Sequence, residues 1–270
     1  MKKTVLIILP VVILFSCKPV HRQIDFKDTN IDAIFLHHST GRYIWYGDIK
    51  QDQRINFTED TCMVPRLIYR HNQKSDLTIG IKERPFPSGD PYPWKNYPFD
   101  YYNIWVKNAG DEPYREEPTL ELLTREYDMI IFKHCFPVSS ILADDNSPDI
   151  DSEKKTLANY KLQYGTIKDK LLSFPETKFI VWTGAALLDH GTNEDEARRA
   201  QEFFDWVRDS WDEKGDNIYI FDFRMLETGG GLYLKPEFSK DPSWDHHPNR
   251  EFSEMAARKF VKRIIEVAEI

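Results

Sequence analysis

Short apolar runs that alternate with amphipathic stretches constrain the fold of this chain more than any other feature of its sequence. From Ile31 onward, each such run is followed by polar residues and then by a stretch with helical periodicity. Continuous apolar runs are typical of strands buried on both faces, and their alternation with helices is typical of a parallel sheet between helical layers. The predicted strands cover residues 33–36, 103–107, 129–132, 179–182 and 218–221. The sequence therefore predicts an α/β fold, a three-layer α/β/α sandwich with a mainly parallel five-stranded sheet.

Four stretches are predicted to be helices of the two outer layers, and they cover residues 119–127, 153–174, 194–211 and a final helix that begins near Pro248. Proline suits the first turn of a helix, where its missing N–H has no intrahelical acceptor. The segment from Asp60 to Pro98 follows neither the strand nor the helix period and is rich in proline and aromatic residues. We expect this irregular insertion to form a lid or wall beside the sheet.

The first residues have the features of an export signal. Met1-Lys2-Lys3 precedes an apolar run from Val5 to Phe15, which is shorter than the roughly 20 residues of a membrane-spanning helix. The run ends at Leu-Phe-Ser-Cys17, which resembles the lipobox of bacterial lipoproteins. This predicts a signal peptide over residues 1–17, a lipid on Cys17, a polar tether over 18–30, one domain over 31–270, and a location in the cell envelope. The alternative is an ordinary cleaved signal with an incidental cysteine.

Charge and cysteine content exclude several classes of protein. The net charge of −8 argues against nucleic acid as a partner, because phosphate binding needs a concentrated basic surface. Beyond Cys17 only Cys62 and Cys135 remain, enough for one disulfide but not for a disulfide scaffold. The absence of a Cys-x-x-Cys pair argues against a thiolate zinc site.

Polar clusters follow four of the predicted strands, and these are His37-His38-Ser39, Asn108-Ala109-Gly110, His134-Cys135 and Thr183-Gly184. Open parallel sheets bind ligands at the carboxyl ends of their strands, so the topology would gather these clusters along one edge. Ser39, at the turn from a strand into a helix, is a candidate nucleophile whose neighbouring N–H groups could stabilise an oxyanion. Asp245-His246-His247, near the other end of the chain, supplies a candidate base and its carboxylate.

Several of these motifs resemble the SGNH/GDSL hydrolases. Phe35-Leu36-His37-His38-Ser39-Thr40-Gly41 resembles their first block, and Asp245-His246-His247-Pro248-Asn249 resembles the last, which carries the catalytic histidine. Asn108-Ala109-Gly110 is similar to the second block, and Lys133-His134-Cys135 falls where the third would be. The His-His-Ser and Cys-Phe-Pro motifs also resemble a branch of uncharacterised SGNH-like proteins.

The resemblance implies a flavodoxin-like SGNH hydrolase fold and a serine esterase that needs no cofactor. Ser39 would be the nucleophile, His247 the base, Asp245 the residue that orients it, and Gly110 an oxyanion donor. The implied substrate is a small-molecule or glycan ester.

The chain also departs from the family pattern. His37 and His38 replace the glycine and aspartate of Gly-Asp-Ser, and we expect them to shape the site. The third block lacks its asparagine, so His134 and Cys135 are expected to line the site in its place. The acid stands two residues before His247 rather than three, which on a helical turn would place the two side chains on opposite sides.

These departures leave other interpretations open. Ser39 could serve only as a helix N-cap, and His246 could be the base in place of His247. The chain could also be a catalytically degenerate SGNH-fold lipoprotein that binds a glycan or a protein partner. A metal-dependent hydrolase using several of the histidines is a third interpretation, although no pair has the His-x-x-x-His spacing of common zinc hydrolases.

Overall fold

The structure is a computed structural model that describes residues 26, 28–47, 62–93, 95–145 and 147–270. The predicted signal peptide with Cys17 and most of the predicted tether lie outside the described residues. Within the described ranges, no helix combines the length and the apolar character needed to cross a membrane.

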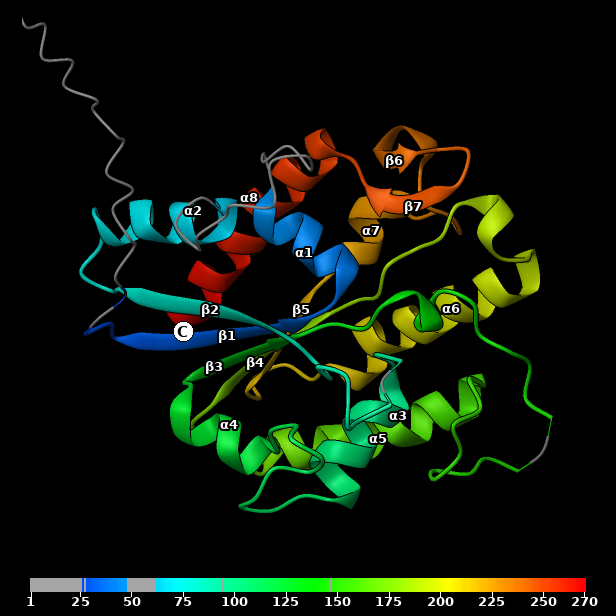
Figure 1. The fold of residues 1–270 in the computed structure, drawn as a ribbon, viewed down its shortest axis with the longest axis horizontal. Coiled ribbons are helices and arrows are strands. Elements are labelled where there is room, and N and C mark those ends of the chain that lie inside the picture. Colours follow the sequence, from blue (N-terminus) through cyan, green and yellow to red (C-terminus); the bar gives the residue numbers. More distant parts are fainter. Residues whose placement is uncertain (1–25, 27, 48–61, 94, 146) are drawn as a thin grey trace, which may run out of the picture.

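Five parallel strands form the central sheet, in the order β2-β1-β3-β4-β5 (Figure 1). The strands are β1 (Ile31–His37), β2 (Ile79–Pro85), β3 (Met129–Phe132), β4 (Lys178–Trp182) and β5 (Ile218–Phe221). This is the strand order of flavodoxin-like folds. The predicted α/β fold with a five-stranded parallel sheet is confirmed.

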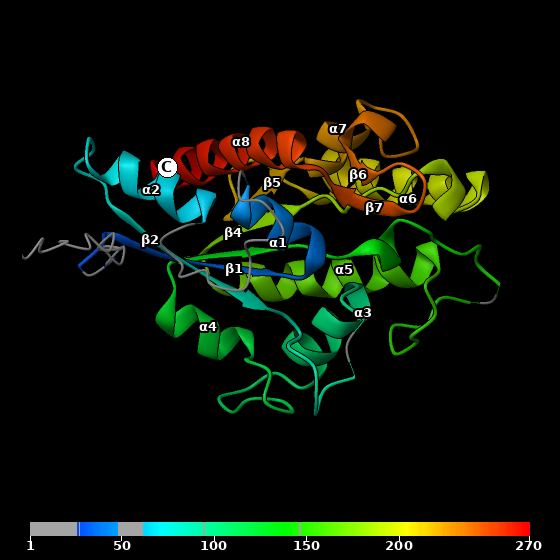
Figure 2. The same cartoon turned by 45° about the horizontal axis from the view of Figure 1, so that its top comes forward.

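Helices cover both faces of the sheet (Figures 1 and 2). One layer consists of α1 (Ser39–Tyr46), α2 (Met63–Asn72), α7 (Phe223–Thr228) and α8 (Arg250–Ala268). The other consists of α3 (Pro98–Tyr101), η3 (Tyr102–Lys107), α4 (Leu120–Glu126), α5 (Leu157–Leu172), α6 (Glu194–Trp206) and η6 (Val207–Trp211). Short helical turns are η4 (Phe136–Val138), η5 (Asp189–Gly191) and η7 (Pro236–Phe238), and β6 (Ser239–Asp241) pairs antiparallel with β7 (Asp245–Pro248).

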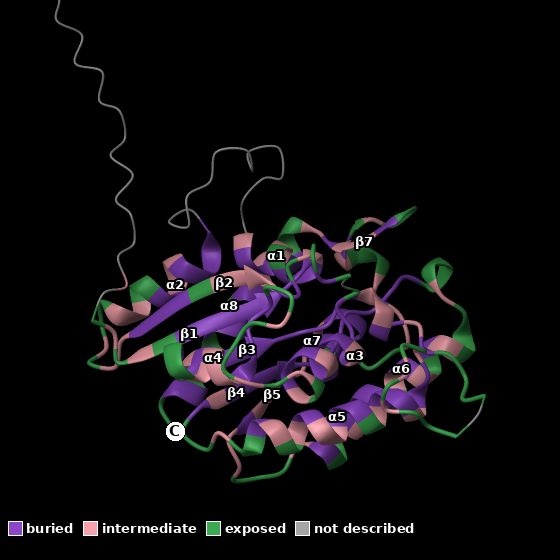
Figure 3. Ribbon diagram, turned by 60° about the horizontal axis from the view of Figure 1, so that its bottom comes forward, coloured by how far each residue is buried: buried purple, intermediate pink, exposed green. Residues whose placement is uncertain are grey.

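The inner strands β1, β3 and β4 are largely apolar because both of their faces are buried. In β1, Ala33 and Phe35 pack into the core under α1, α2 and α8, whereas Ile34 and Leu36 pack into the core under α3, α4 and α5. This two-residue alternation is the geometry of an extended strand. Figure 3 shows buried strands that lie between helices whose outer faces are exposed.

The predicted strand over 103–107 is wrong, because this segment is helical and continues α3 as η3. Tyr101, Ile104 and Trp105 are all buried, and their spacing of three and four residues places them on one helical face. Ile-Trp-Val therefore packs as part of a helix against α5 rather than as a strand.

The segment 60–98 is not merely a lid or wall, since it contains α2 and the edge strand β2. Every residue of β2 pairs with a residue of β1, from Ile79 opposite Ile31 to Pro85 opposite His37. The second half of β2, Lys82-Glu83-Arg84, is charged, as is common in strands at the edge of a sheet. A search for apolar runs cannot detect a strand in which three successive residues are charged.

Candidate active site

Ser39 is the first residue of α1 and stands two residues after His37, the last residue of β1. The residue that caps α1 is His38, in extended conformation, so Ser39 is not the N-cap. The side chain of His38 makes no capping hydrogen bond, and the N–H groups of the first turn of α1 and the positive end of its dipole lie beside the serine. Gly41 makes the turn compact, because a Cβ there would lie 2.6 Å from Cβ and Cγ of His37.

Ser39 contacts a residue that follows the neighbouring strand β3. Its Oγ lies 3.6 Å from Sγ of Cys135, and Nζ of Lys133 lies 3.7 Å from the same sulfur. Lys133 is completely buried and Cys135 is nearly so. The structure thus brings together Ser39, Cys135 and a buried lysine at the carboxyl ends of β1 and β3.

His247 and Asp245 lie on β7, next to α8. Nδ1 of His247 is 2.7 Å from Oδ1 of Asp245, and the backbone N–H of His247 donates to the same oxygen at 3.0 Å. Burial would by itself raise the pKa of Asp245, but the hydrogen bonds from His247 outweigh it, and the pKa stays below its usual value. Lys240 Nζ lies 3.2 Å from the second carboxylate oxygen. Asp245 is therefore a carboxylate that holds the Nδ1–H tautomer of His247.

The ring of His247 lies against two aromatic side chains, one on the helix that begins at Ser39 and one next to Cys135. Tyr43, four residues after Ser39 and thus on the same face of α1, stacks on it with centroids 4.9 Å apart. Phe136, next to Cys135, meets it edge-on at 5.2 Å. The structure therefore places His247 against the two elements that carry Ser39 and Cys135.

The free nitrogen of His247 is available as a proton acceptor. Nε2 is buried and has no hydrogen-bond partner among the described residues, and Ser39 Oγ is directed to Cys135 instead. Catalytic hydrogen bonds are often long without ligand and tighten when substrate binds.

His37 and His38 are buried within the turn that follows β1. Nε2 of His37 lies 2.6 Å from the Glu83 carboxylate on β2. Nε2 of His38 lies 2.5 Å from the carbonyl oxygen of Pro87, and burial lowers the pKa of His38 to about 4. His38 is therefore neutral at physiological pH and donates this hydrogen bond. The two histidines attach the Ser39 turn to β2 and the segment after it.

The structure does not bring His134 or Gly110 to Ser39. His134 points into the opposite core, where its ring contacts Tyr101 at 4.6 Å and Tyr164 at 5.5 Å. The carbonyl of Gly110 accepts from Thr119, and its N–H donates to Glu121 on α4, which lies on the other side of the sheet. His134 packs on the far side because successive residues of an extended chain point to opposite faces, and Gly110 because its segment is helical.

His246 is directed away from Asp245, since alternate residues of β7 face opposite sides. Its Nδ1 accepts from the N–H of Leu188 at 3.3 Å, and its ring contacts His190. Its pKa is lowered, chiefly by burial. Within the described ranges, no group of three or more His, Cys, Asp or Glu residues is placed to hold a metal ion. Cys62 and Cys135 are not joined in a disulfide.

Sequence reasoning did not single out Lys133, Tyr43, Phe136 or Lys240. For Lys133 a signal exists, because a lysine directly after the four apolar residues of β3 stands at the edge of the sheet where the polar clusters gather. Tyr43 lies at the helical spacing of four from Ser39. Nothing in the sequence indicates that Lys240 would contact Asp245, because that contact depends on the pairing of β6 with β7.

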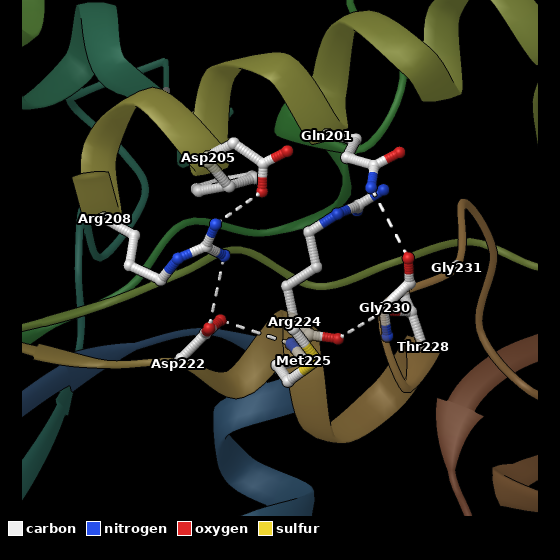
Figure 4. Close-up of a pocket in the computed structure, with 10 residues that line it drawn as sticks. Gln201, Asp205, Arg208, Asp222, Arg224, Met225, Thr228, Gly230 and Gly231 are labelled. Atoms are coloured by element: carbon white, nitrogen blue, oxygen red, sulfur yellow. Dashed lines mark hydrogen bonds and ion pairs between the residues drawn. The ribbon is translucent and has the colours of Figure 1, made fainter. Parts of the chain in front are cut away.

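A cavity of about 230 Å³ lies apart from these residues, between α6 and α7 (Figure 4). Arg208 is held there by Asp205 at 3.0 Å and by Asp222 at 3.5 Å. Arg224 donates to the carbonyl of Leu232 at 2.8 Å. None of the residues around Ser39 and His247 lines this cavity.

Comparisons with known proteins find similarity only among solved structures. No protein-family model matches the chain, and a search of curated proteins returns no significant match. The chain is similar to a family two carbohydrate esterase from Cellvibrio japonicus, with a TM-score of 0.44 and 12% identity over 89% of this chain and 62% of that one. It is also similar to an active-site mutant of a family two carbohydrate esterase from Clostridium thermocellum, with a TM-score of 0.42 and 12% identity. That match covers 88% of this chain and 64% of the esterase. The chain thus spans less than two thirds of the length of either esterase.

Proposed function

We propose that the protein is a serine esterase of the SGNH type in which Ser39 is the nucleophile and His247 the general base. The observation that carries the proposal is the set of contacts made by the His247 ring. Its Nδ1 is held by Asp245, and its Nε2 has no partner among the described residues. Its ring packs against Tyr43, on the helix that begins at Ser39, and against Phe136, next to Cys135. Acyl transfer needs a base that is held in one tautomer and has a free nitrogen for the proton of the nucleophile, and these features of His247 support the proposal.

In the proposed reaction, Ser39 Oγ attacks the ester carbonyl while its proton moves to Nε2 of His247. The N–H groups at the start of α1 stabilise the oxyanion of the tetrahedral intermediate. The intermediate collapses when the imidazolium gives its proton to the leaving alcohol, and an acyl-serine remains. Water, deprotonated by His247, then attacks the acyl-serine and releases the acid, and the proton returns to Ser39. Asp245 stabilises the imidazolium in both halves.

As substrate class we propose O-acylated glycans, with acetyl esters as the first to test. The described surface beside the site supports this choice, because Trp244, directly before Asp245, is 66% exposed. An exposed indole beside a polar site provides a platform for the apolar face of a sugar ring.

The decisive experiment is labelling with a fluorophosphonate, together with hydrolysis of p-nitrophenyl acetate and acetylated oligosaccharides. We expect the wild type to label, and Ser39→Ala to lose labelling and at least about 10³-fold of its turnover. Ser173→Ala is a matched control, because this serine is exposed at the end of α5. A Ser39→Ala protein that labels and turns over like the wild type would exclude this function.

A second candidate function is a binding protein with this fold and no catalysis. It is supported by the hydrogen bond of Ser39 to Cys135 rather than to His247. A folded wild type that does not label, yet binds oligosaccharides in calorimetry with an affinity reduced by Trp244→Ala, would favour it.

We further propose that Cys17 carries lipid and anchors the protein in the cell envelope, on the basis of the residues that precede it. Cys17→Ser should move the protein from the membrane fraction to the soluble fraction and lower its mass by that of the lipid. A wild type that lacks added mass on Cys17 would contradict this.

A further inference from the structure

Lys133 is buried at the base of the candidate site. It follows β3, its backbone N–H donates to Leu36 of β1, and its side chain is 0% exposed. Nζ donates to Sγ of Cys135 at 3.7 Å, and Cys135 lies 3.6 Å from Ser39 Oγ. One thiol therefore connects a buried ammonium to the proposed nucleophile.

In the part of the chain that the structure describes, no ionised carboxylate lies close enough to neutralise this ammonium. Within the described residues, Lys133 forms no ion pair at 4.0 Å or less with Asp or Glu. Glu227 interacts with it through space, but burial raises the pKa of Glu227 to about 8, so this acid is mostly protonated at neutral pH. Among the described residues, no ionised acid therefore pairs with the ammonium under Ser39.

A buried charge without a counter-ion opposes folding, because it loses its hydration and gains little in return. The same charge would favour any negative charge that develops nearby in a site shielded from water. In the reaction proposed above, negative charge develops on Ser39 Oγ during attack and then on the former carbonyl oxygen. The third motif also lacks the asparagine amide that donates to this oxyanion in the family it resembles.

We propose that Lys133 is a positioning residue whose ammonium orients the Cys135 thiol toward Ser39 and stabilises the negative charge formed during ester attack. This inference rests on the proposed esterase function. It assigns the stabilisation of the negative charge in that reaction to a residue directly after β3. Before attack, the Ser39 hydroxyl donates to Sγ. When that proton moves to His247, the S–H of Cys135 donates to Oγ, and the Lys133 ammonium continues to donate to the sulfur. No proton leaves Lys133 or Cys135.

The main test is Lys133→Met, which keeps the length of the side chain but removes its charge. We expect the second-order rate of fluorophosphonate labelling at Ser39 and the kcat for p-nitrophenyl acetate to fall about 10²-fold, the effect of losing one oxyanion-stabilising group. KM should change less than twofold. The melting temperature should be unchanged or higher, because a buried charge has been removed. Lys133→Arg, which keeps the charge, should recover part of the labelling rate.

A purely structural role predicts a different pattern, in which Lys133→Met lowers the melting temperature and loses activity only in proportion to folded protein. Active-site titration separates the two. The pair Cys135→Ala and Cys135→Ser provides a test that leaves Lys133 in place. Alanine should slow labelling about five- to tenfold, the range of one neutral hydrogen bond, whereas serine should restore most of the rate.

The outcomes distinguish this inference from the function on which it rests. If the wild type labels and Ser39→Ala does not, but Lys133→Met labels at the wild-type rate, the role of Lys133 is overturned and the esterase stands. If Lys133→Met does not fold, equal rates for Cys135→Ala, Cys135→Ser and wild type overturn the inference. A folded wild type that does not label overturns both proposals.

Discussion

Nδ1 of His247 lies 2.7 Å from Oδ1 of Asp245, although only one residue separates them in the sequence. On a helical turn this spacing would direct the two side chains apart. Both residues lie on strand β7, however, and in an extended strand residues two apart share a face. The same carboxylate oxygen also accepts the backbone N–H of His247, which closes a compact ring. Asp245 can therefore orient His247 without the spacing of three seen in the family it resembles.

The first prediction concerns this pair. Asp245→Asn should lower kcat/KM for p-nitrophenyl acetate by about 10² to 10⁴-fold, because an amide can hold the imidazole in the wrong tautomer and cannot balance the imidazolium charge. Asp241→Asn is the matched control, since Asp241 is a half-buried acid of the same hairpin whose carboxylate accepts hydrogen bonds from Ser243 and Trp244 rather than from His247. Equal kcat/KM values for the two variants would contradict the role of Asp245.

The second prediction concerns the packing of the base. Tyr43 stacks on the His247 ring at an interplanar angle of 19°, and its hydroxyl lies 3.4 Å from Lys240 Nζ. Tyr43→Phe keeps the ring and should retain kcat within about twofold, whereas Tyr43→Ala removes it and should lower kcat about tenfold, because a small displacement of a catalytic group is costly. The kcat ratio of the two variants is the measurement. A larger loss in Tyr43→Phe would assign the effect to the hydroxyl instead.

The third prediction compares two glycines. Gly41→Ala should lower the free energy of unfolding by about 1 to 3 kcal/mol, because the new Cβ would lie 2.6 Å from the buried side chain of His37. Gly165→Ala on α5 has nothing within 4 Å of its new Cβ and should raise stability by up to about 1 kcal/mol. Urea unfolding at neutral pH gives both values. The two variants should therefore change the free energy of unfolding in opposite directions. A Gly41→Ala protein as stable as the wild type would show that the turn after β1 can relax.

The fourth prediction concerns the buried carboxyl of Glu227. Its ordinary pKa of 4.5 is raised to about 8, chiefly by burial. Between these values the folded protein holds a proton that the unfolded chain has released, so the contribution of Glu227 to stability falls as pH rises from about 4.5 to 8. Glu227→Gln should remove this slope and be more stable than wild type at pH 8, by up to a few kcal/mol at about 1.4 kcal/mol per pKa unit.

Unfolding of wild type and Glu227→Gln in urea at pH 5 and pH 8 measures this difference. Glu237→Gln is the control, because Glu237 is an exposed acid of the short turn η7 and should not change the pH dependence. Parallel stability curves for wild type and Glu227→Gln would show that the carboxyl ionises without penalty in the folded protein.

The segments that could be predicted are those in which one local pattern decided the structure. Strands β3 and β5 have the predicted bounds, because four apolar residues in succession between polar segments are typical of a strand in a sheet covered by helices. The segment 103–107 was predicted wrongly, since Ile-Trp-Val fits a buried strand and a buried helix equally well. Only its packing on α5 decided between them. Strand β2 could not be predicted, because an edge strand contacts a neighbour on one side and tolerates charge.

The sequence by itself determined the α/β architecture and the two regions in which the candidate nucleophile and base stand, since both follow from local pattern and from the strand ends of an open sheet. The tertiary structure alone decided which neighbours complete the site. It directs Cys135 toward Ser39 and His134 into the opposite core, and it buries Lys133 beneath them. In an extended chain, adjacent side chains point to opposite faces, so His134 and Cys135 must lie on different sides of the sheet. Which of the two faces α1 depends on how the helices pack on the sheet, and the local sequence does not determine this.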